Sequence, residues 1–173
     1  MSDIQWPAGF VPGFTDNFCS NEVIVTGISV DAAWHLLATP TLWPDYYANS
    51  ANPRFHDDKG PQLALGDRFY FETFGFPVEA RVVECIAPVA GQPARLAWHG
   101  WAGNDETDRL DVHHAWLIEA LSENRVRILT QETQVGAPAK QLASDPSHPM
   151  IHGHQQWLDG MVQAARQLLR TEA

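Results

Sequence analysis

The sequence predicts a single α+β domain in which an antiparallel sheet of about six or seven strands packs against one long C-terminal helix. Three observations favour this fold. Residues 150–170 separate apolar from polar side chains at the period of an α-helix. Most of the chain before that helix alternates apolar and polar residues between turn-forming clusters, as strands do. Two short helical segments follow the first of these strands.

The composition is that of one globular domain with an acidic surface. The chain has 173 residues, of which 21 are acidic and 11 basic, so its formal net charge is −10. That charge argues against nucleic acid as a partner, and no apolar run approaches the ~20 residues that membrane insertion requires. The N-terminus lacks the pattern of a signal peptide. Cys19 and Cys85 are isolated, which favours a cytoplasmic protein with free thiols over one with a disulfide.

Residues 1–20 are predicted to form an aromatic N-terminal arm, and residues 21–173 a single domain. Two prolines and two glycines disfavour a helix in the arm. Aromatic residues nevertheless recur there at every fourth position, as Trp6, Phe10, Phe14 and Phe18. These side chains either pack on their own domain or cross to a second subunit, which would make the protein a homodimer.

The first elements after the arm are short. Residues 22–28 are predicted to form a strand, and residues 30–38 a helix that Ser29 or Asp31 can cap. Two prolines then frame a second short helix. It contains Leu42, Trp43, Tyr46 and Tyr47.

Six further strands are predicted from alternation and from the turn residues between them. They are residues 52–57, 66–74, 76–87, 95–101, 110–121 and 125–135. Gly75 permits a tight turn between two of these strands, and an acidic loop, 102–109, precedes the last pair. Residues 136–147 are predicted to be a connection to the final helix.

The register of the last two strands follows from the loop between them. That loop, 122–124, has three residues, a common length for a β-hairpin. Closing the hairpin there makes Leu121 face Arg125. The same register pairs Ile118 with Ile128, Trp116 with Thr130, and His114 with Glu132. Facing side chains have Cβ atoms about 5 Å apart. The sequence therefore predicts an imidazole beside a carboxylate on the apolar face, unless a bulge shifts the pairing.

The final helix carries an apolar arc of roughly 160°, wider than the stripe of an ordinary surface helix. The arc contains Met150, Ile151, His154, Trp157, Leu158, Met161, Val162, Ala165, Leu168 and Leu169. His154 lies near its middle and is expected to face the same space as His114 and Glu132. Gly153 and Gly160 share one edge of the helix, where they allow close approach of a strand or leave room for a ligand.

Several short motifs follow one another along the chain. They are Trp34 within 30–38, Leu42-Trp43-Pro44, Gly66-Asp67-Arg68-Phe69, Arg95-Leu96-Ala97-Trp98, His114-Ala115-Trp116-Leu117-Ile118-Glu119 and Thr130-Gln131-Glu132. With these motifs, residues 20–170 resemble the SRPBCC superfamily, also called START-like or helix-grip, and most of all its polyketide cyclase/dehydrase-like branch. The resemblance implies a helix-grip fold, in which a strongly curved antiparallel sheet wraps around the C-terminal helix. It also implies a deep, mostly apolar cavity between that sheet and the helix. Such cavities hold lipids, polyketides, hormones or other small molecules.

The implied cavity defines the candidate site. The predicted ligand-binding residues are Phe69, Phe71, Trp98, Trp116, Thr130, His154, Trp157 and Met161. His114 and Glu132 are the predicted catalytic pair, because burial shifts the pKa values of an imidazole and a carboxylate and lets them exchange protons near neutral pH. Two other roles remain open for the pair, namely lining a cavity without chemistry and satisfying each other as a structural pair.

The histidines of the last helix do not predict a metal site. His148, His152 and His154 follow the pattern H-x3-H-x-H. At about 100° per residue, His152 falls on the polar face and His154 on the apolar face, so these three cannot converge on one ion. The sequence also shows no phosphate-cradling loop, nucleophile elbow or dinucleotide fingerprint. We therefore predict no metal and no bound cofactor.

Two classes of function fit these observations. The first is binding of a small hydrophobic, amphipathic or aromatic molecule, with or without cyclase/dehydratase-like chemistry at His114 and Glu132. The second is a non-enzymatic protein-interaction module resembling chaperone-ATPase activators. A cavity of roughly 300 Å³ or more, with the pair on its wall, favours the first class. A collapsed interior with a large exposed apolar patch favours the second.

Overall fold

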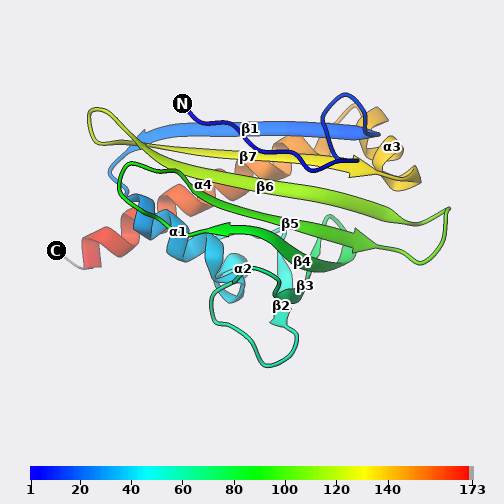
Figure 1. Ribbon diagram of the computed structural model, residues 1–173, viewed down its shortest axis with the longest axis horizontal. Helices are drawn as coiled ribbons and strands as arrows, with labels where there is room; N and C mark the ends of the chain where they lie inside the picture. The colour runs from blue at the N-terminus through cyan, green and yellow to red at the C-terminus, as the bar shows by residue number, and fades with distance from the viewer. Residues whose placement is uncertain (172–173) are drawn as a thin grey trace.

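The computed structural model describes residues 1–171 and shows one antiparallel sheet curved around one long helix (Figure 1). Among the described residues, seven strands lie in the order β1-β7-β6-β5-β4-β3-β2, so every neighbouring pair except β1–β7 is consecutive in sequence. Within the described residues the predicted fold class is therefore confirmed: α+β, with the sheet gripping the C-terminal helix and two short helices after the first strand.

Every pair of neighbouring strands is antiparallel. The strands are β1 (Asn17–Thr26), β2 (Ala51–Phe55), β3 (Arg68–Thr73), β4 (Phe76–Ile86), β5 (Ala94–Ala102), β6 (Leu110–Leu121) and β7 (Arg125–Val135). The helical segments are α1 (Val30–Ala38), η1 (Pro40–Leu42), α2 (Trp43–Tyr46), α3 (Ala137–Ser144) and α4 (Pro149–Thr171).

Helix α1 begins where the sequence predicts. The Ser29 hydroxyl accepts a hydrogen bond of 3.0 Å from the Ala32 N–H, which satisfies one of the free donors of the first turn. The face of α1 that carries Trp34 and Leu37 is buried. Both α1 and α2 contact α4, so the two short helices help to hold the long one against the sheet.

Two stretches differ from the prediction. Strand β1 begins at Asn17, inside the range assigned to the arm, because residues 17–21 continue the pairing with β7 as far as Gln134. The interval predicted as a connection to the last helix contains α3. Its Ala139 packs against Leu110 and Val112 in a small separate cluster. The helix has only eight residues, too few to show a clear period in the sequence.

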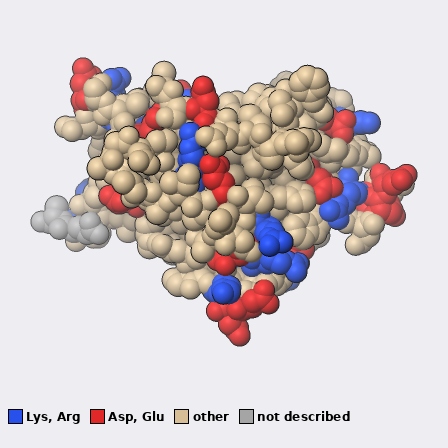
Figure 2. Space-filling view, viewed as in Figure 1, with Lys and Arg blue, Asp and Glu red and all other residues tan. Residues whose placement is uncertain are grey.

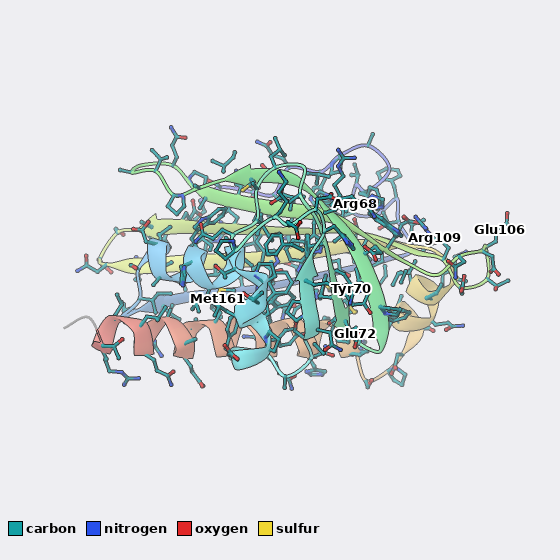
Figure 3. The ribbon with its side chains drawn as sticks, turned by 90° about the horizontal axis from the view of Figure 1, so that it is seen from below. Arg68, Tyr70, Glu72, Glu106, Arg109 and Met161 are labelled. Carbon is teal, nitrogen blue, oxygen red and sulfur yellow. The ribbon has the colours of Figure 1, made fainter. Side chains whose placement is uncertain are left out.

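Helix α4 crosses the concave face of the sheet with its apolar arc inward. The buried apolar-arc residues are Met150, His154, Trp157, Leu158, Met161, Val162 and Ala165. Leu168 and Leu169 are half-buried, whereas Ile151, at the edge of the predicted arc, is 44% exposed. Figure 3 shows side chains filling the space between α4 and the sheet, with Met161 on the inner side of the helix.

Aromatic rings fill most of the interior. Trp43 from α2 lies at the centre of this core, with its ring stacked on Trp98 at a centroid distance of 5.5 Å. It also meets the edge of Trp157 at 5.0 Å and that of Phe71 at 5.2 Å. Tyr47 stacks on Trp157 at a centroid distance of 4.6 Å. Large rings from α2, α4, β3 and β5 therefore occupy space that a smaller set of side chains would leave open.

The N-terminal arm lies on the convex face of its own sheet, where polar contacts tether its first residues. The Ser2 N–H donates to Glu119 Oε1 at 3.1 Å, and Arg127 Nη1 donates to the Ser2 carbonyl at 2.6 Å. Arg95 Nη1 donates to the Asp3 carbonyl at 2.9 Å. These bonds are all intramolecular, and Figure 1 shows the dark blue arm running across the sheet.

Two of the arm's aromatic side chains pack on the same convex face. Trp6 and Phe10 contact the ring of His113 at centroid distances of 5.5 and 6.0 Å. The Thr133 hydroxyl donates to the Phe10 carbonyl at 2.8 Å. Phe14, in contrast, is 87% exposed. Trp6 and Phe10 therefore pack on their own domain, which is one of the two arrangements expected for the arm, whereas Phe14 does not.

The surface carries a mixture of charges. Figure 2 shows acidic and basic side chains interspersed on one face, with much uncharged surface between them. Cys19 and Cys85 are both free thiols. Across residues 1–171, no helix has the combination of length and hydropathy that crossing a bilayer requires.

Candidate functional site

His114 on β6 and Glu132 on β7 lie directly opposite each other in the register derived from the three-residue loop. His114 Nδ1 is 3.0 Å from Glu132 Oε2. The two side chains are only 3% and 7% exposed. Both face α4, because the period of the strand points every second residue to the concave side. The predicted imidazole–carboxylate pair is therefore confirmed as a structural feature.

His154 on α4 completes a buried trio with this pair. Its Nε2 lies 3.7 Å from the same carboxylate oxygen, Glu132 Oε2. The His154 ring stacks on that of His114 with centroids 4.6 Å apart and planes 21° apart. We call these three residues, His114, Glu132 and His154, the polar trio. The sequence predicts that His154 faces this space, and the structure brings it within contact distance.

The remaining polar atoms of the two histidines have partners as well. His114 Nε2 lies 2.8 Å from the Thr130 hydroxyl. His154 Nδ1 lies 3.4 Å from the Cys19 thiol. Each ring is therefore held through both nitrogens, one facing Glu132 and the other facing a neighbouring side chain.

Gln134 satisfies the carboxylate from the other side. Its Nε2 donates a short hydrogen bond to Glu132 Oε1, while Glu132 Oε2 faces the two histidines. The same Gln134 nitrogen lies 3.6 Å from Met150 Sδ at the start of α4. The buried carboxylate thus has partners on both oxygens, as a buried charge requires.

Burial and neighbouring groups set the ionisation of the site. Burial alone raises the pKa of Glu132, but His114, His154 and Gln134 together outweigh it and hold that pKa below its usual range. The carboxylate is therefore ionised at neutral pH. Burial, and then the neighbouring His114, lower the pKa of His154 to about 3, so its imidazole is neutral. Burial, with a contribution from Glu132, raises the pKa of Cys19, which stays a thiol.

A small cavity adjoins the polar trio. Its volume is about 30 Å³, enough for about two water molecules and about one tenth of the roughly 300 Å³ expected for a ligand pocket. It is lined by Phe71, Thr73, Phe74, Phe76, Val78, Trp98, Leu110, Val112, His114, Glu132, Gln134, Leu142, Met150, His154 and Trp157. The expectation of a deep cavity is therefore wrong for this conformation, because aromatic rings occupy the interior.

The partly exposed lining residues mark where the cavity reaches the surface. They are Thr73, Phe74, Phe76 and Leu142. Phe74 lies in the turn between β3 and β4, Thr73 and Phe76 are the strand residues that flank this turn, and Leu142 belongs to α3. We call this group the cavity mouth.

Comparison with known proteins identifies the fold. No protein-family model matches the sequence, and no curated protein matches it. Among solved structures, the hypothetical protein jhp0584 from Helicobacter pylori is 46% identical, with 96% of this chain and 98% of that chain covered and a TM-score of 0.91. The chain belongs to the same family as that protein.

More distant structures share the fold alone. Norcoclaurine synthase from Thalictrum flavum is 14% identical over 88% of this chain and 92% of its own, with a TM-score of 0.56. Protein CV1439 from Chromobacterium violaceum is 13% identical over 87% and 98%, with a TM-score of 0.57. The protein thus has the helix-grip fold that these structures share.

This helix-grip protein places only half of the eight predicted ligand-binding residues on the cavity wall. Phe71, Trp98, His154 and Trp157 line the cavity. The remaining four, Phe69, Trp116, Thr130 and Met161, are buried in the core beside it.

Sequence reasoning missed the cavity mouth and the outer partners of the polar trio. The β1–β7 register pairs Cys19 with Glu132, so extending the first strand back to Asn17 would have found Cys19. Gln134 shares the inward face of β7 with Glu132, two residues away, and the same alternation would have identified it. No local pattern points to Phe74 or Leu142, because their place depends on how the β3–β4 turn and α3 pack.

Proposed function

We propose that the protein binds a small, mostly apolar molecule between α4 and the sheet, with the polar trio at one end of the site. The observation that supports this proposal is the trio itself. Replacing a buried ionic group by well-packed apolar side chains is often neutral or stabilising by about 1–4 kcal/mol. Packing alone therefore does not account for an ionised Glu132 that is 5% exposed. Buried clusters with displaced pKa values are typical of functional sites.

The lining indicates the chemical class of the ligand. Most of the wall is apolar, and the rings of Trp98 and Trp157 offer surfaces suited to a flat or ringed molecule. Glu132 and the histidines can hold one polar group at the inner end. An amphipathic or aromatic molecule with a single polar end fits this distribution.

Ligand entry requires the cavity mouth to open. Phe74 is the side chain best placed to move, since it lies in the β3–β4 turn and its backbone has a φ of 49°, a value that non-glycine residues rarely adopt. Its ring rests on Gly153 of α4, and its N–H donates to Asn49 Oδ1 at 2.9 Å. Displacing this ring would widen the cavity at its mouth.

A related fold supports small-molecule binding in general terms. A point mutant of norcoclaurine synthase from Thalictrum flavum, 14% identical to this chain, has been crystallised in complex with a transition-state analogue. At that identity the comparison shows a shared fold and does not indicate a shared ligand.

The experiment measures binding before and after the mouth is opened. We expect Phe74→Ala to bind the fluorescent apolar probe 1-anilinonaphthalene-8-sulfonate about tenfold more tightly than the wild type, because the ligand no longer displaces a ring worth about 1.5–3 kcal/mol of burial. Tryptophan quenching provides the signal, since Trp98 and Trp157 line the cavity. Phe14→Ala is the matched control, because Phe14 is exposed on the arm and distant in sequence from the mouth.

Native mass spectrometry of freshly purified protein gives the second measurement, with a co-purified small molecule as the expected result. Equal probe binding by wild type, Phe74→Ala and Phe14→Ala, together with an empty native mass spectrum, would contradict the proposal.

The second candidate is the interaction module. The small cavity favours it, because a collapsed interior is one of its two expected features. The other feature is a large exposed apolar patch. The exposed large apolar side chains are instead distributed over the arm, β1, β4, β7, α4 and two loops. We therefore place this function second.

Acid–base chemistry at His114 and Glu132 stays a prediction, as does the likeness to the polyketide cyclase/dehydrase branch. The acid–base role can be tested once a substrate is known. His114→Ala and Glu132→Gln should abolish turnover while the circular dichroism spectrum is preserved. Unchanged turnover in both variants would rule out the acid–base role.

A further inference from the structure

We propose that the polar trio is a binding site for a divalent transition-metal ion such as Zn²⁺, with His114 Nδ1, His154 Nε2 and Glu132 Oε2 as ligands. The three residues each offer a donor atom, and these atoms all lie within 4.8 Å of one another. The ion does not require the small molecule proposed above, so either proposal can fail without the other.

The spacing of the donor atoms fits a small ion. Zinc binds histidine nitrogen and carboxylate oxygen at about 2.0–2.2 Å, so two ligands of a tetrahedral ion are about 3.4 Å apart. The observed distances from Glu132 Oε2 are 3.0 Å to His114 Nδ1 and 3.7 Å to His154 Nε2. These two values lie on either side of the tetrahedral spacing and need shifts of only a few tenths of an ångström. The nitrogens of the two histidines lie within 4.8 Å of each other and need to approach by up to about 1.4 Å.

The outer atoms of the ligands are oriented as in metal sites. A histidine that binds a metal through one nitrogen usually donates its other N–H to a neighbouring group, which fixes the ring. His114 Nε2 faces the Thr130 hydroxyl at 2.8 Å, and His154 Nδ1 faces Cys19 Sγ at 3.4 Å. Glu132 Oε1 accepts from Gln134, which leaves Oε2 for the ion.

Ion binding at His154 requires a change of tautomer that this site can accommodate. Cys19 Sγ lies 3.4 Å from Nδ1, and when the thiol donates to that nitrogen the ring proton of a neutral imidazole is on Nε2, facing Glu132. When an ion takes Nε2, the proton on that nitrogen passes to water and Nδ1 takes one from water, so that the Nδ1–H then donates a hydrogen bond to Cys19 Sγ. The ring carries one proton before and after, so His154 releases no net proton.

The donor set and the cavity together indicate a site with an open position. Two histidines and one carboxylate are the protein ligands of several catalytic zinc sites and of non-haem iron sites, which keep the remaining positions for water or substrate. The cavity of about 30 Å³ borders all three residues and has room for a water. A fourth ligand can therefore come from solvent.

Ion binding would change the stacking of the two imidazole rings. Their planes are now 21° apart, with centroids separated by 4.6 Å. A nitrogen lone pair lies in the plane of its ring, so one ring must turn about its Cβ–Cγ bond to direct both lone pairs at one ion. Both rings line the adjoining cavity, which offers free space beside them.

The test uses the full-length protein, stripped of metal with a chelator, and Co²⁺ as the probe. We expect one equivalent of Co²⁺ to produce the visible absorption bands of a low-coordinate ion and Zn²⁺ to displace it. His154→Ala removes one ligand and should abolish the bands. His152→Ala is the matched control, because His152 is exposed on the outer face of α4, two residues away.

A milder variant keeps the test decisive if His154→Ala fails to fold. Thr130→Val preserves side-chain shape and removes only the hydroxyl that holds His114. We expect it to weaken Co²⁺ binding about 10–100-fold, while its melting temperature without metal can be measured separately. The proposal is wrong if the wild type gives no bands, or if His154→Ala and Thr130→Val both bind Co²⁺ as well as the wild type. It is also wrong if His152→Ala is the variant that loses binding.

Discussion

Tyr47 shows, at the scale of one residue, how burial changes the chemistry of a side chain. It is 1% exposed, and its ring stacks on Trp157 with planes 17° apart. Its hydroxyl accepts a hydrogen bond of 2.9 Å from Asn49 Nδ2. Burial is the main reason that the pKa of Tyr47 rises to about 12, because an ionised phenolate would lose its hydration in the core.

This displaced pKa predicts a loss of stability at alkaline pH. The folded pKa lies above the unfolded value of about 10, so the contribution is complete below pH 10 and is lost as pH rises toward 12. We expect the free energy of unfolding to fall by about 2–3 kcal/mol over this range from Tyr47 alone. Urea unfolding of the wild type and of Tyr47→Phe at pH 9 and 11.5 measures this fall in the free energy of unfolding. If the free energies of unfolding of the wild type and the variant have the same pH dependence, the loss of stability does not come from Tyr47.

The polar trio and its partners show which contacts of a residue can be predicted from the nearby sequence and which cannot. The loop of three residues and the period of two place His114 opposite Glu132 without any tertiary information. The helical period places His154 on the inner face of α4. The position of Cys19 beside Glu132 cannot be predicted in this way. Strand β1 begins inside a segment whose prolines, glycines and aromatic residues indicate an arm.

At the scale of the element, two glycines of α4 allow neighbouring groups to pack closely against the helix. A Cβ added at Gly153 would clash with the Phe74 ring, and one added at Gly160 would clash with the Tyr46 carbonyl. Gly153 therefore makes room for a side chain of the cavity mouth, and Gly160 for the backbone of α2. The neighbour is in neither case the strand or the ligand that the sequence suggests.

A double-mutant cycle tests this fit. We expect Gly153→Ala to destabilise the protein by about 1–3 kcal/mol, because the Phe74 ring must leave its packed position. In a Phe74→Ala background the clash is gone, so the same change should be neutral or stabilising by up to about 1 kcal/mol from helix propensity. Urea unfolding of the four proteins gives the coupling. Additive effects would show that Gly153 and Phe74 do not contact each other.

The sequence predicts helix α4 but does not predict helix α3. The 23 residues of α4 contain several turns, so the apolar arc is unambiguous and only its edge at Ile151 departs from the prediction. The eight residues of α3 bury one alanine and are stabilised by contacts with β6. A helix that depends on such contacts carries too little local signal to be found in the sequence.

At the scale of the whole molecule, the sheet is covered on both faces. Helix α4 covers the concave face, and the arm covers part of the convex face through Ser2, Asp3, Trp6 and Phe10. The arm shields Arg127, whose guanidinium also pairs with Glu119 at 2.8 Å and with Glu22 at 2.6 Å. The arm is thus a structural part of this fold.

Deletion of residues 2–10 tests that role. We expect a loss of about 2–5 kcal/mol in the free energy of unfolding, from lost apolar burial and several lost hydrogen bonds. Urea unfolding measures it, and light scattering measures the oligomeric state, which should not change because the arm's contacts described above lie within one chain. A dimer that dissociates on deletion would show that the arm crosses to a second subunit.

The local patterns of the chain are sufficient to derive the strands of the sheet, the inward face of the long helix and the pairing of His114 with Glu132. The reason is that side-chain periods and turn lengths are short-range properties that survive in any compact arrangement. They reveal neither the partners of Glu132 outside its hairpin nor the volume left between helix and sheet. Those depend on how rings from α2, α4, β3 and β5 interlock across the interior, and only the folded molecule brings them together.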